Sequence, residues 1–220
     1  MGDVTGEATR YETVPTDAGE ARIVWYEGPE GTDPWAVLAL GHGAGGGVEA
    51  RDLRALAGAL PARGVTVALV EQPWRVAGRK VAPAPKTLDT AWRGLWPALA
   101  KPGLPVVAGG RSAGARVACR TGRDLGALAV LALSFPLHPP GRPERSRAAE
   151  LLGTGLPTLV VQGGNDPFGR PEEYPDGPHR LVVVPYGDHG LALPRRAPLG
   201  QDEALALLVD GVAEWLDALR

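Results

Sequence analysis

Cysteine is nearly absent from this sequence, which has one, Cys119, among 220 residues. A single thiol cannot form an internal disulfide, and no Cys/His cluster has zinc-site spacing, so we expect a cytoplasmic protein without metal or cofactor. A chain of this length buries roughly 70% of its extended-chain surface on folding, so its stability requires neither disulfides nor a structural metal. We interpret Cys119 as a buried filler of the core.

Long hydrophobic runs and an excess of positive charge are also missing. The longest apolar run, Ala127 to Leu133, is far shorter than the roughly 20 residues that cross a bilayer as a helix. Lys and Arg number 23 against 25 Asp and Glu, so nothing favours binding to a phosphate backbone. The start, MGDVTGEATRYE, lacks both an apolar signal-peptide region and the Ser or Thr at position 6 of a myristoylation signal. We expect neither a nucleic-acid nor a membrane partner.

Glycine and proline are abundant, with 31 and 22 residues, but a hydrophobic content of 44% predicts a folded domain. Short apolar runs alternate with longer amphipathic stretches, a pattern typical of βα units around a mostly parallel sheet with helices on both faces. No break in composition divides the chain, so we expect one α/β domain over residues 1–220. The predicted strands are Ala21–Tyr26, Trp35–Leu40, Val65–Val70, Pro105–Ala108, Leu128–Leu133, Pro157–Val161 and Leu181–Val184. The predicted helices are Val48–Leu60, Leu88–Ala100, Ala113–Thr121 and Asp202–Leu219.

The polar and glycine-rich segments all follow predicted strands. In open parallel sheets, ligands bind beyond the carboxyl ends of the strands, so the chemistry is expected there. The proline-rich segments Gln72–Pro85 and Phe135–Pro143 are predicted to be surface loops around the site. The segments that follow strands are GHGAGGG at 41, EQPW at 71, GGRSAGAR at 109, QGGNDPFG at 162 and YGDHGL at 186.

The segment from Gly110 to Gly114 fits the G-x-S-x-G pattern of a nucleophile elbow, a sharp strand-to-helix turn that presents a serine above the sheet. Such a turn brings backbone segments close together, so the residues two before and two after Ser112 must be small. Gly110 and Gly114 meet that requirement. We predict that Ser112 is a nucleophile.

A serine needs a base, and the base needs an orienting carboxylate. Asp166 follows the penultimate predicted strand and His189 follows the last one, which gives the chain order Ser, Asp, His of α/β hydrolases. Asp188 is the rival acid, but neighbouring side chains usually diverge. We therefore favour Asp166 as the partner of His189 and expect Asp188 to order the histidine loop through an Asx-type turn.

The loop from Gly41 to Gly47 lies between a predicted strand and a predicted helix, as does the HG-containing loop that donates to an oxyanion hole. The backbone N–H groups of Ala44 and Ala113 are the expected donors. The loop also matches the dinucleotide pattern G-x-G-x-x-G, with Glu71 ending the next strand. That alternative leaves Ser112, Asp166 and His189 unexplained, and Glu71 lies further along than the usual spacing.

The other histidines are weaker candidates for the base. His179 precedes a strand, at the wrong edge of the sheet, and His42 is expected to shape its own loop. His138 is more readily a structural imidazole within a proline-rich loop than a site residue. The segment between Leu133 and Pro157 is too short for a cap domain, which predicts an open site. Candidate walls of its substrate pocket are His42, Trp74, Arg111, Phe135, Leu137, His138 and Phe168.

Five segments together resemble α/β hydrolases, and within them the small lidless group of testis-expressed and NSL-complex-subunit homologues, related to dienelactone-hydrolase-like proteins. The resemblance spans residues 41–190. It implies an α/β-hydrolase fold, with Ser112 as nucleophile, Asp166 as acid and His189 as base. Because the group includes subunits of protein complexes, it also implies that a protein partner is conceivable. The segments are GHGAGG, GGRSAGARVA, FPLHPPGRPE, DPFGRPEE and GDHGL.

These observations predict a serine hydrolase that cleaves a small-molecule ester or related acyl compound through an acyl-enzyme. The alternative is a binding or interaction module that keeps the fold without catalysis. Labelling with a fluorophosphonate discriminates between them, because only an activated serine reacts.

Overall fold

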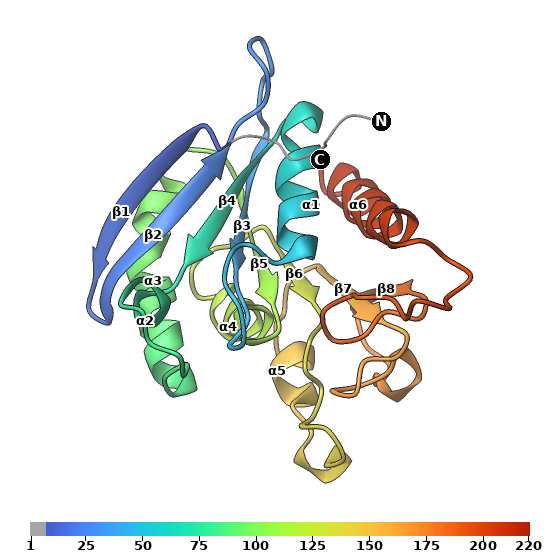
Figure 1. Cartoon of the computed structure of the whole chain (residues 1–220). Helices are drawn as coiled ribbons and strands as arrows, with labels where there is room; N and C mark the ends of the chain where they lie inside the picture. Colours follow the sequence, from blue (N-terminus) through green and yellow to red (C-terminus); the bar gives the residue numbers. More distant parts are fainter. Residues whose placement is uncertain (1–7) are drawn as a thin grey trace.

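The protein is built on one eight-stranded sheet, seen in a computed structural model that describes residues 8–220 (Figure 1). The strand order is β1-β2-β4-β3-β5-β6-β7-β8; β1, β2 and β4 pair antiparallel, and all the other neighbours are parallel. This is the α/β-hydrolase fold. The N-terminal residues on which the signal-peptide and myristoylation expectations largely depend lie outside the described residues. The strands are β1 (Arg10–Thr16), β2 (Gly19–Tyr26), β3 (Ala36–Gly41), β4 (Val65–Glu71), β5 (Val106–Arg111), β6 (Ala129–Leu133), β7 (Thr158–Gly163) and β8 (Arg180–Val184).

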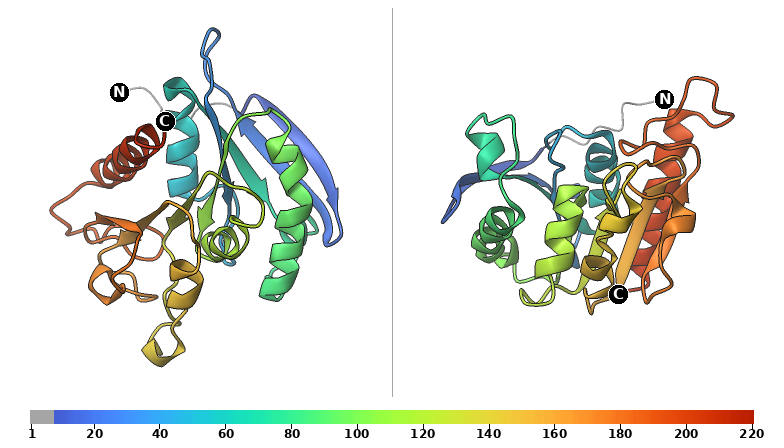
Figure 2. Two further views of the ribbon diagram at one scale, coloured as in Figure 1. Left: turned by 180° about the vertical axis from the view of Figure 1, so that it is seen from behind. Right: turned by 90° about the horizontal axis from the view of Figure 1, so that it is seen from below.

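Helices cover both faces of the sheet (Figure 2). Helices α1 (Arg51–Ala59) and α6 (Gln201–Asp217) pack on one face, and α3 (Pro85–Ala100), α4 (Ala113–Thr121) and α5 (Ala148–Leu152) pack on the other. Successive residues of a strand point to opposite faces, so the central strands need apolar residues at every position. The continuous hydrophobicity of the predicted strands thus reflects burial on both sides.

Helix α4 packs on the sheet through several small side chains. Ala115 and Ala118 on the helix join the same buried cluster as Ala108 and Ala132 on β5 and β6. Cys119, on the same helix, is 3% exposed and belongs to this cluster, as expected of a core filler. Burial raises the pKa of its thiol to about 12.

All seven predicted strands and all four predicted helices are present, with ends shifted by up to three residues. Strand β1 was not predicted, because it is a partly exposed edge strand whose sequence, RYETVPT, has no continuous apolar run. The expected loop Gln72–Pro85 instead contains the short helix α2 (Pro73–Val76) and the first residue of α3. Helix α5 was also missed, since five residues are too short for a periodic pattern to emerge.

The connection between β6 and β7, residues 134–157, contains only α5 and the 3-10 turn η2 (Pro143–Arg145). No cap domain therefore covers the carboxyl end of the sheet in residues 8–220, as the sequence predicted. Across those residues, every helix is too short or too polar to traverse a lipid bilayer.

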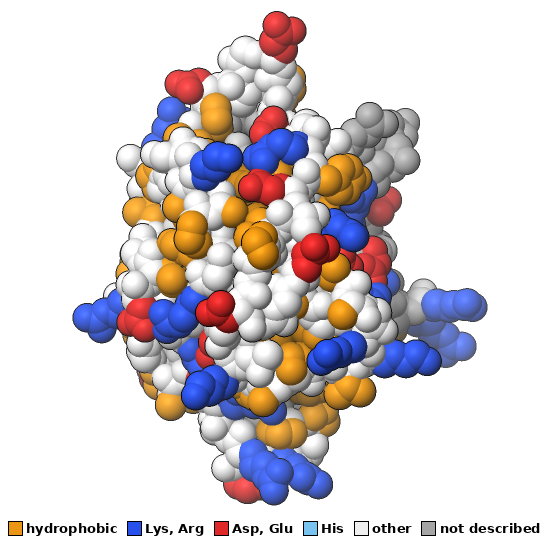
Figure 3. All heavy atoms as spheres, turned by 90° about the vertical axis from the view of Figure 1, so that its left-hand side faces the viewer, with side chains coloured by type: hydrophobic (Ala, Val, Ile, Leu, Met, Phe, Trp, Pro, Cys, Tyr) orange, Lys and Arg blue, Asp and Glu red, His pale blue; other side chains and the backbone are white. Residues whose placement is uncertain are grey.

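Positive and negative side chains are interspersed on the side of the molecule where β1 and β2 lie (Figure 3). The apolar areas between them are small and separate. Side chains of both charge signs are spread over this side, in keeping with the net charge of −2.

Candidate active site

Ser112 occupies a strained turn between β5 and α4. Its backbone has φ 53° and ψ −108°, a combination that residues other than glycine rarely adopt. A Cβ on Gly110 would lie 2.6 Å from the Gly41 carbonyl oxygen, and one on Gly114 would lie 2.5 Å from the same atom. The elbow therefore needs glycine at both positions, as predicted from the pattern.

Three predicted residues from separate loops meet in one line of hydrogen bonds. The Ser112 hydroxyl lies 2.9 Å from His189 Nε2, and His189 Nδ1 lies 2.8 Å from Asp166 Oδ2. With a neutral imidazole, Nδ1–H donates to the carboxylate and Nε2 accepts from the hydroxyl. This is the arrangement in which a base can remove the serine proton.

Asp166 is fully buried, and its carboxylate also accepts hydrogen bonds from two donors other than His189. Its Oδ1 accepts from the Phe168 backbone N–H at 2.8 Å, and Oδ2 accepts from the Gln162 side-chain amide at 2.8 Å. Gln162 also donates to the Gly169 carbonyl at 2.8 Å. These donors fix the carboxylate with Oδ2 facing His189 Nδ1.

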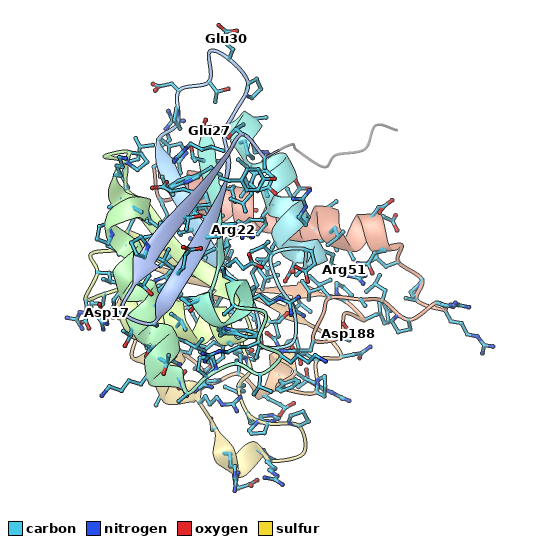
Figure 4. All side chains as sticks on the ribbon, turned by 60° about the vertical axis from the view of Figure 1, so that its left-hand side comes forward. Asp17, Arg22, Glu27, Glu30, Arg51 and Asp188 are labelled. Carbon is cyan, nitrogen blue, oxygen red and sulfur yellow. The ribbon has the colours of Figure 1, made fainter. Side chains whose placement is uncertain are left out.

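The aspartate and histidine loops are joined by backbone contacts. The Asn165 N–H donates to the Gly187 carbonyl at 2.8 Å. Asp188 Oδ1 accepts from the N–H groups of Gly190 and Ala192 at 2.7 and 2.9 Å, which confirms the expected Asx-type turn. Asp188 lies in the loop after β8, at the opposite end of the sheet from the β2–β3 loop that carries Glu30 (Figure 4). The carboxylate hydrogen-bonded to His189 is thus Asp166 and not Asp188.

Arg111, the residue before the serine, points toward the histidine loop. One of its terminal nitrogens, Nη2, donates to the His189 carbonyl at 2.6 Å, and Nε lies 3.1 Å from Asp52 Oδ2 in an ion pair without hydrogen-bond geometry. Asp52 is fully buried in the first turn of α1. Burial raises the pKa of Asp52, and the positive charge of Arg111 opposes that rise. One guanidinium thus connects α1, the elbow and the histidine loop.

His42 holds the loop after β3 in place, as expected. Its Nε2 accepts from the Gln72 backbone N–H at 3.1 Å, so its Nδ1 carries the proton and donates to the Gly43 carbonyl at 2.8 Å. Burial lowers the pKa of His42, which favours this neutral form. In a trans peptide the N–H points opposite to the C=O, so the Ala44 N–H is directed away from the His42 ring. Within residues 8–220, neither this N–H nor that of Ala113 donates a hydrogen bond.

The remaining expected pocket residues have different environments. Trp74 is 5% exposed and packs against His42, with ring centroids 5.5 Å apart. Phe168 stacks on His189, with ring centroids 4.1 Å apart and planes at 28°. Phe135 and Leu137 are 0% and 4% exposed and belong to the core. The structure places both side chains in the core, and neither is among the residues that line the pocket beside Ala113.

His138 forms the structural contact that the sequence favoured. Its Nδ1 lies 2.9 Å from the Pro139 carbonyl and its Nε2 lies 2.8 Å from Glu173 Oε2. Both partners only accept, so both contacts are hydrogen bonds when the ring is protonated on both nitrogens. The Pro139 carbonyl and Glu173 raise the pKa of His138. His179 lies at the amino end of β8, away from Ser112.

Sequence reasoning missed three residues that support the site: Asp52, Gln72 and Gln162. Each is a buried polar residue within or beside an apolar segment. The sequence signal that could have found them is a polar residue within or directly beside an apolar segment, and Gln162 near the end of β7 is the clearest case. Among residues 8–220, no three His, Cys, Asp or Glu side chains are grouped as metal ligands.

Comparison with known proteins gives the wider context. No curated protein matches the sequence. A serine hydrolase without lid from Xanthomonas campestris is 18% identical, with a TM-score of 0.70 and 94% of both chains covered. An alpha-beta serine hydrolase homologue from Coxiella burnetii is 16% identical, with a TM-score of 0.73 and coverage of 94% of this chain and 98% of that one.

A dienelactone hydrolase from Anabaena variabilis is 21% identical, with a TM-score of 0.68 and coverage of 95% of this chain and 96% of that one. These likenesses concern the fold. The profile described as "Alpha/beta hydrolase domain" matches residues 34–217, which include the elbow and both loops that meet it. The chain belongs to the Alpha/beta hydrolase domain family.

Proposed function

We propose that the protein is a serine hydrolase of carboxylesterase type, acting on a small ester or related acyl compound. The hydrogen-bonded line from Ser112 through His189 to Asp166 is the observation that carries this proposal. From the segments GGRSAGARVA and GDHGL, we also propose that the chain lies near the small lidless group of testis-expressed and NSL-complex-subunit homologues.

In the first half-reaction, Ser112 Oγ attacks the carbonyl carbon while His189 Nε2 takes the hydroxyl proton. Asp166 holds the imidazole through Nδ1 and stabilises the imidazolium that forms. The tetrahedral intermediate collapses, His189 passes the proton to the leaving alcohol, and an acyl-Ser112 ester remains. Water then attacks that ester with His189 again as base, which releases the acid and restores Ser112.

Ala44 and Ala113 are the proposed oxyanion donors. Ala113 is the first residue of α4, so its N–H lies at the positive end of the helix dipole and has no partner within the helix. The His42 contact to Gly43 fixes the peptide that carries the Ala44 N–H. Such donors typically contribute about 100- to 1000-fold each to the rate.

The test combines fluorophosphonate labelling with turnover of an aryl acetate. We expect the wild type to be labelled at Ser112, and Ser112→Ala to lose labelling and lower kcat by roughly 10⁴-fold or more. His189→Asn should lower kcat similarly, because the base is lost.

Ser134→Ala is the matched control. Ser134 also has a positive φ directly after a strand, and its buried hydroxyl has no hydrogen-bond partner in the described chain. The control should keep labelling and turnover. A wild type that resists labelling, or Ser112→Ala with unchanged turnover, would contradict the proposal and favour a binding module.

A further inference from the structure

A narrow pocket opens beside the two proposed oxyanion donors. The centre of a water-sized group has about 10 Å³ of space in it, which leaves room for roughly one water or methyl group. The loop after β3 forms one wall, and Gly43 in that loop comes so near the elbow that a Cβ there would lie 3.4 Å from Ser112 Cβ. The residues that define the pocket here are Ala44, Trp74, Ala82, Leu88, Ala113 and Val117.

The pocket lies on one side of Ser112 and His189 approaches from the other. Ser112 directly follows β5, and in the sheet β3 and β4 lie on one side of β5 while β6, β7 and β8 lie on the other. The lining residues come from the loops after β3 and β4 and from α3 and α4. His189 follows β8, and Asp166 follows β7.

This arrangement determines on which side of Ser112 the alcohol and the acyl group of an ester would lie. His189 returns its proton to the leaving alcohol, so that alcohol must lie on the histidine side of the carbonyl carbon. The acyl substituent points away from the leaving group, toward the loops after β3 and β4. With the carbonyl oxygen between Ala44 and Ala113, this substituent faces the narrow pocket.

We infer that this pocket is the acyl site and that it restricts the enzyme to acetyl-sized acyl groups. The inference rests on the proposed function. The intermediate is acetyl-Ser112, and water releases acetate from it. The leaving alcohol is not limited in the same way, because no cap covers that end of the sheet in the described residues.

The lining also selects against charged acyl groups. Leu88 and Val117 are apolar, the Gln72 amide is uncharged, and the His42 ring is neutral because its Nε2 accepts a backbone N–H. A carboxylate on the acyl chain, as in a succinyl ester, would lose its hydration without gaining a cationic partner. The substrate class is therefore the short, uncharged acyl ester.

The experiment measures kcat/KM for aryl acetate, butyrate and hexanoate. A pocket that does not fit an added methylene discriminates by about 10- to 200-fold, so wild type should prefer acetate over butyrate by at least about tenfold. Leu88→Ala enlarges the pocket and should raise the butyrate-to-acetate ratio about tenfold. Ala82→Leu, on the loop before α3, should narrow it and lower turnover even of acetate.

Leu95→Ala is the matched control. Leu95 lies two turns further along the same buried face of α3, and it does not line the pocket. It should lose comparable stability and keep the wild-type chain-length profile. A shift equal to that of Leu88→Ala would overturn the inference.

The wild-type profile separates the two proposals without any variant. Turnover that depends on Ser112 and equals or exceeds the acetate rate with butyrate or hexanoate would overturn the acyl-site inference while the hydrolase assignment stands. Absence of turnover on all three esters together with absence of fluorophosphonate labelling would overturn both.

Discussion

Arg111 illustrates how one side chain can set the position of another at the residue scale. Its guanidinium pairs with the buried Asp52 and donates to the carbonyl of His189. For the proposed proton transfer, the imidazole has to remain within hydrogen-bond reach of Ser112. Arg111 acts through the histidine loop, so we regard it as a positioning residue.

We predict that Arg111→Lys lowers kcat by roughly 10- to 100-fold with little change in KM. A lysine ammonium can pair with Asp52, but it lacks the separate guanidinium nitrogen that donates to the His189 carbonyl at the same time. A charge-assisted hydrogen bond contributes about 1.5–3 kcal/mol, which sets the expected size. Steady-state kinetics on an aryl acetate measures both constants.

The control for this substitution is Arg116→Lys. Arg116 is also partly buried and makes two hydrogen bonds to Glu150, away from the elbow. It should lose some thermal stability and keep kcat. The double variant Asp52→Leu with Arg111→Met removes the buried pair and should still have a low kcat, because the His189 carbonyl loses its donor; wild-type kcat in that double variant would refute the positioning role.

At this scale the sequence predicts the candidate reactive residues better than the residues that hold them in position. Ser112 and its two glycines form a local pattern that can be recognised from the sequence alone, although part of its steric reason is the Gly41 carbonyl on the neighbouring strand β3. Asp52, by contrast, matters only because α1 places it beside Arg111. Contacts between residues so far apart in the chain are set by the sheet topology, which a single sequence does not display.

At the scale of elements, the segment after β7 is held by a contact between two loops. His138 lies in the loop after β6, and Glu173 lies in the 3-10 turn η3 (Pro171–Glu173). The His138 N–H also donates to the Phe168 carbonyl at 2.9 Å. The loop that stacks Phe168 on His189 is thus tied to the loop after β6.

This contact should contribute a pH-dependent part of the stability. The pKa of His138 is raised in the folded state, so its stabilising charge is fully present below the unfolded value of about 6.5. The stabilisation is lost as the pH rises through the folded pKa. We predict that Glu173→Gln lowers the free energy of unfolding more at about pH 6 than at about pH 9.

Denaturant unfolding of both proteins at the two pH values measures that difference. His42, whose pKa burial lowers, titrates in both proteins and cancels in the comparison. Glu172→Gln, which changes the exposed neighbour, is the control and should show no such pH dependence. An equal effect of Glu173→Gln at both pH values would show that the pair is uncharged.

The elements themselves were predictable where both faces of a strand are covered. β3 and β4 consist almost entirely of apolar residues because helices pack on both sides. β1 lies at the sheet edge, so its residues alternate between partly buried and exposed, and polar residues suffice. Helix α2 begins at Pro73 and spans four residues, which is below the length at which hydrophobic periodicity is informative.

At the scale of the whole molecule, the continuous sheet couples the two buried clusters. One cluster contains Leu95 on α3 and the other contains Leu56 on α1, and the strands contribute residues to both. The single domain stays a prediction. The two clusters should therefore unfold together.

We predict that Leu56→Ala and Leu95→Ala each lower the midpoint of one common unfolding transition. Both side chains are fully buried, and replacing such a leucine costs about 2–5 kcal/mol. Thermal unfolding followed by far-ultraviolet circular dichroism and by tryptophan fluorescence tests this, because the two signals should coincide. A second transition that moves with only one of the variants would indicate two independent domains.

The burial of Cys119 has a practical consequence for work in solution. Its thiol is enclosed between α4 and the sheet, and burial raises its pKa to about 12, so maleimide reagents find no thiolate there in the native state. A cysteine introduced at Val81, which is 80% exposed and precedes Ala82 at the pocket wall, would then be the sole site of attachment. A dye or spin probe could follow pocket occupancy without prior removal of the native cysteine.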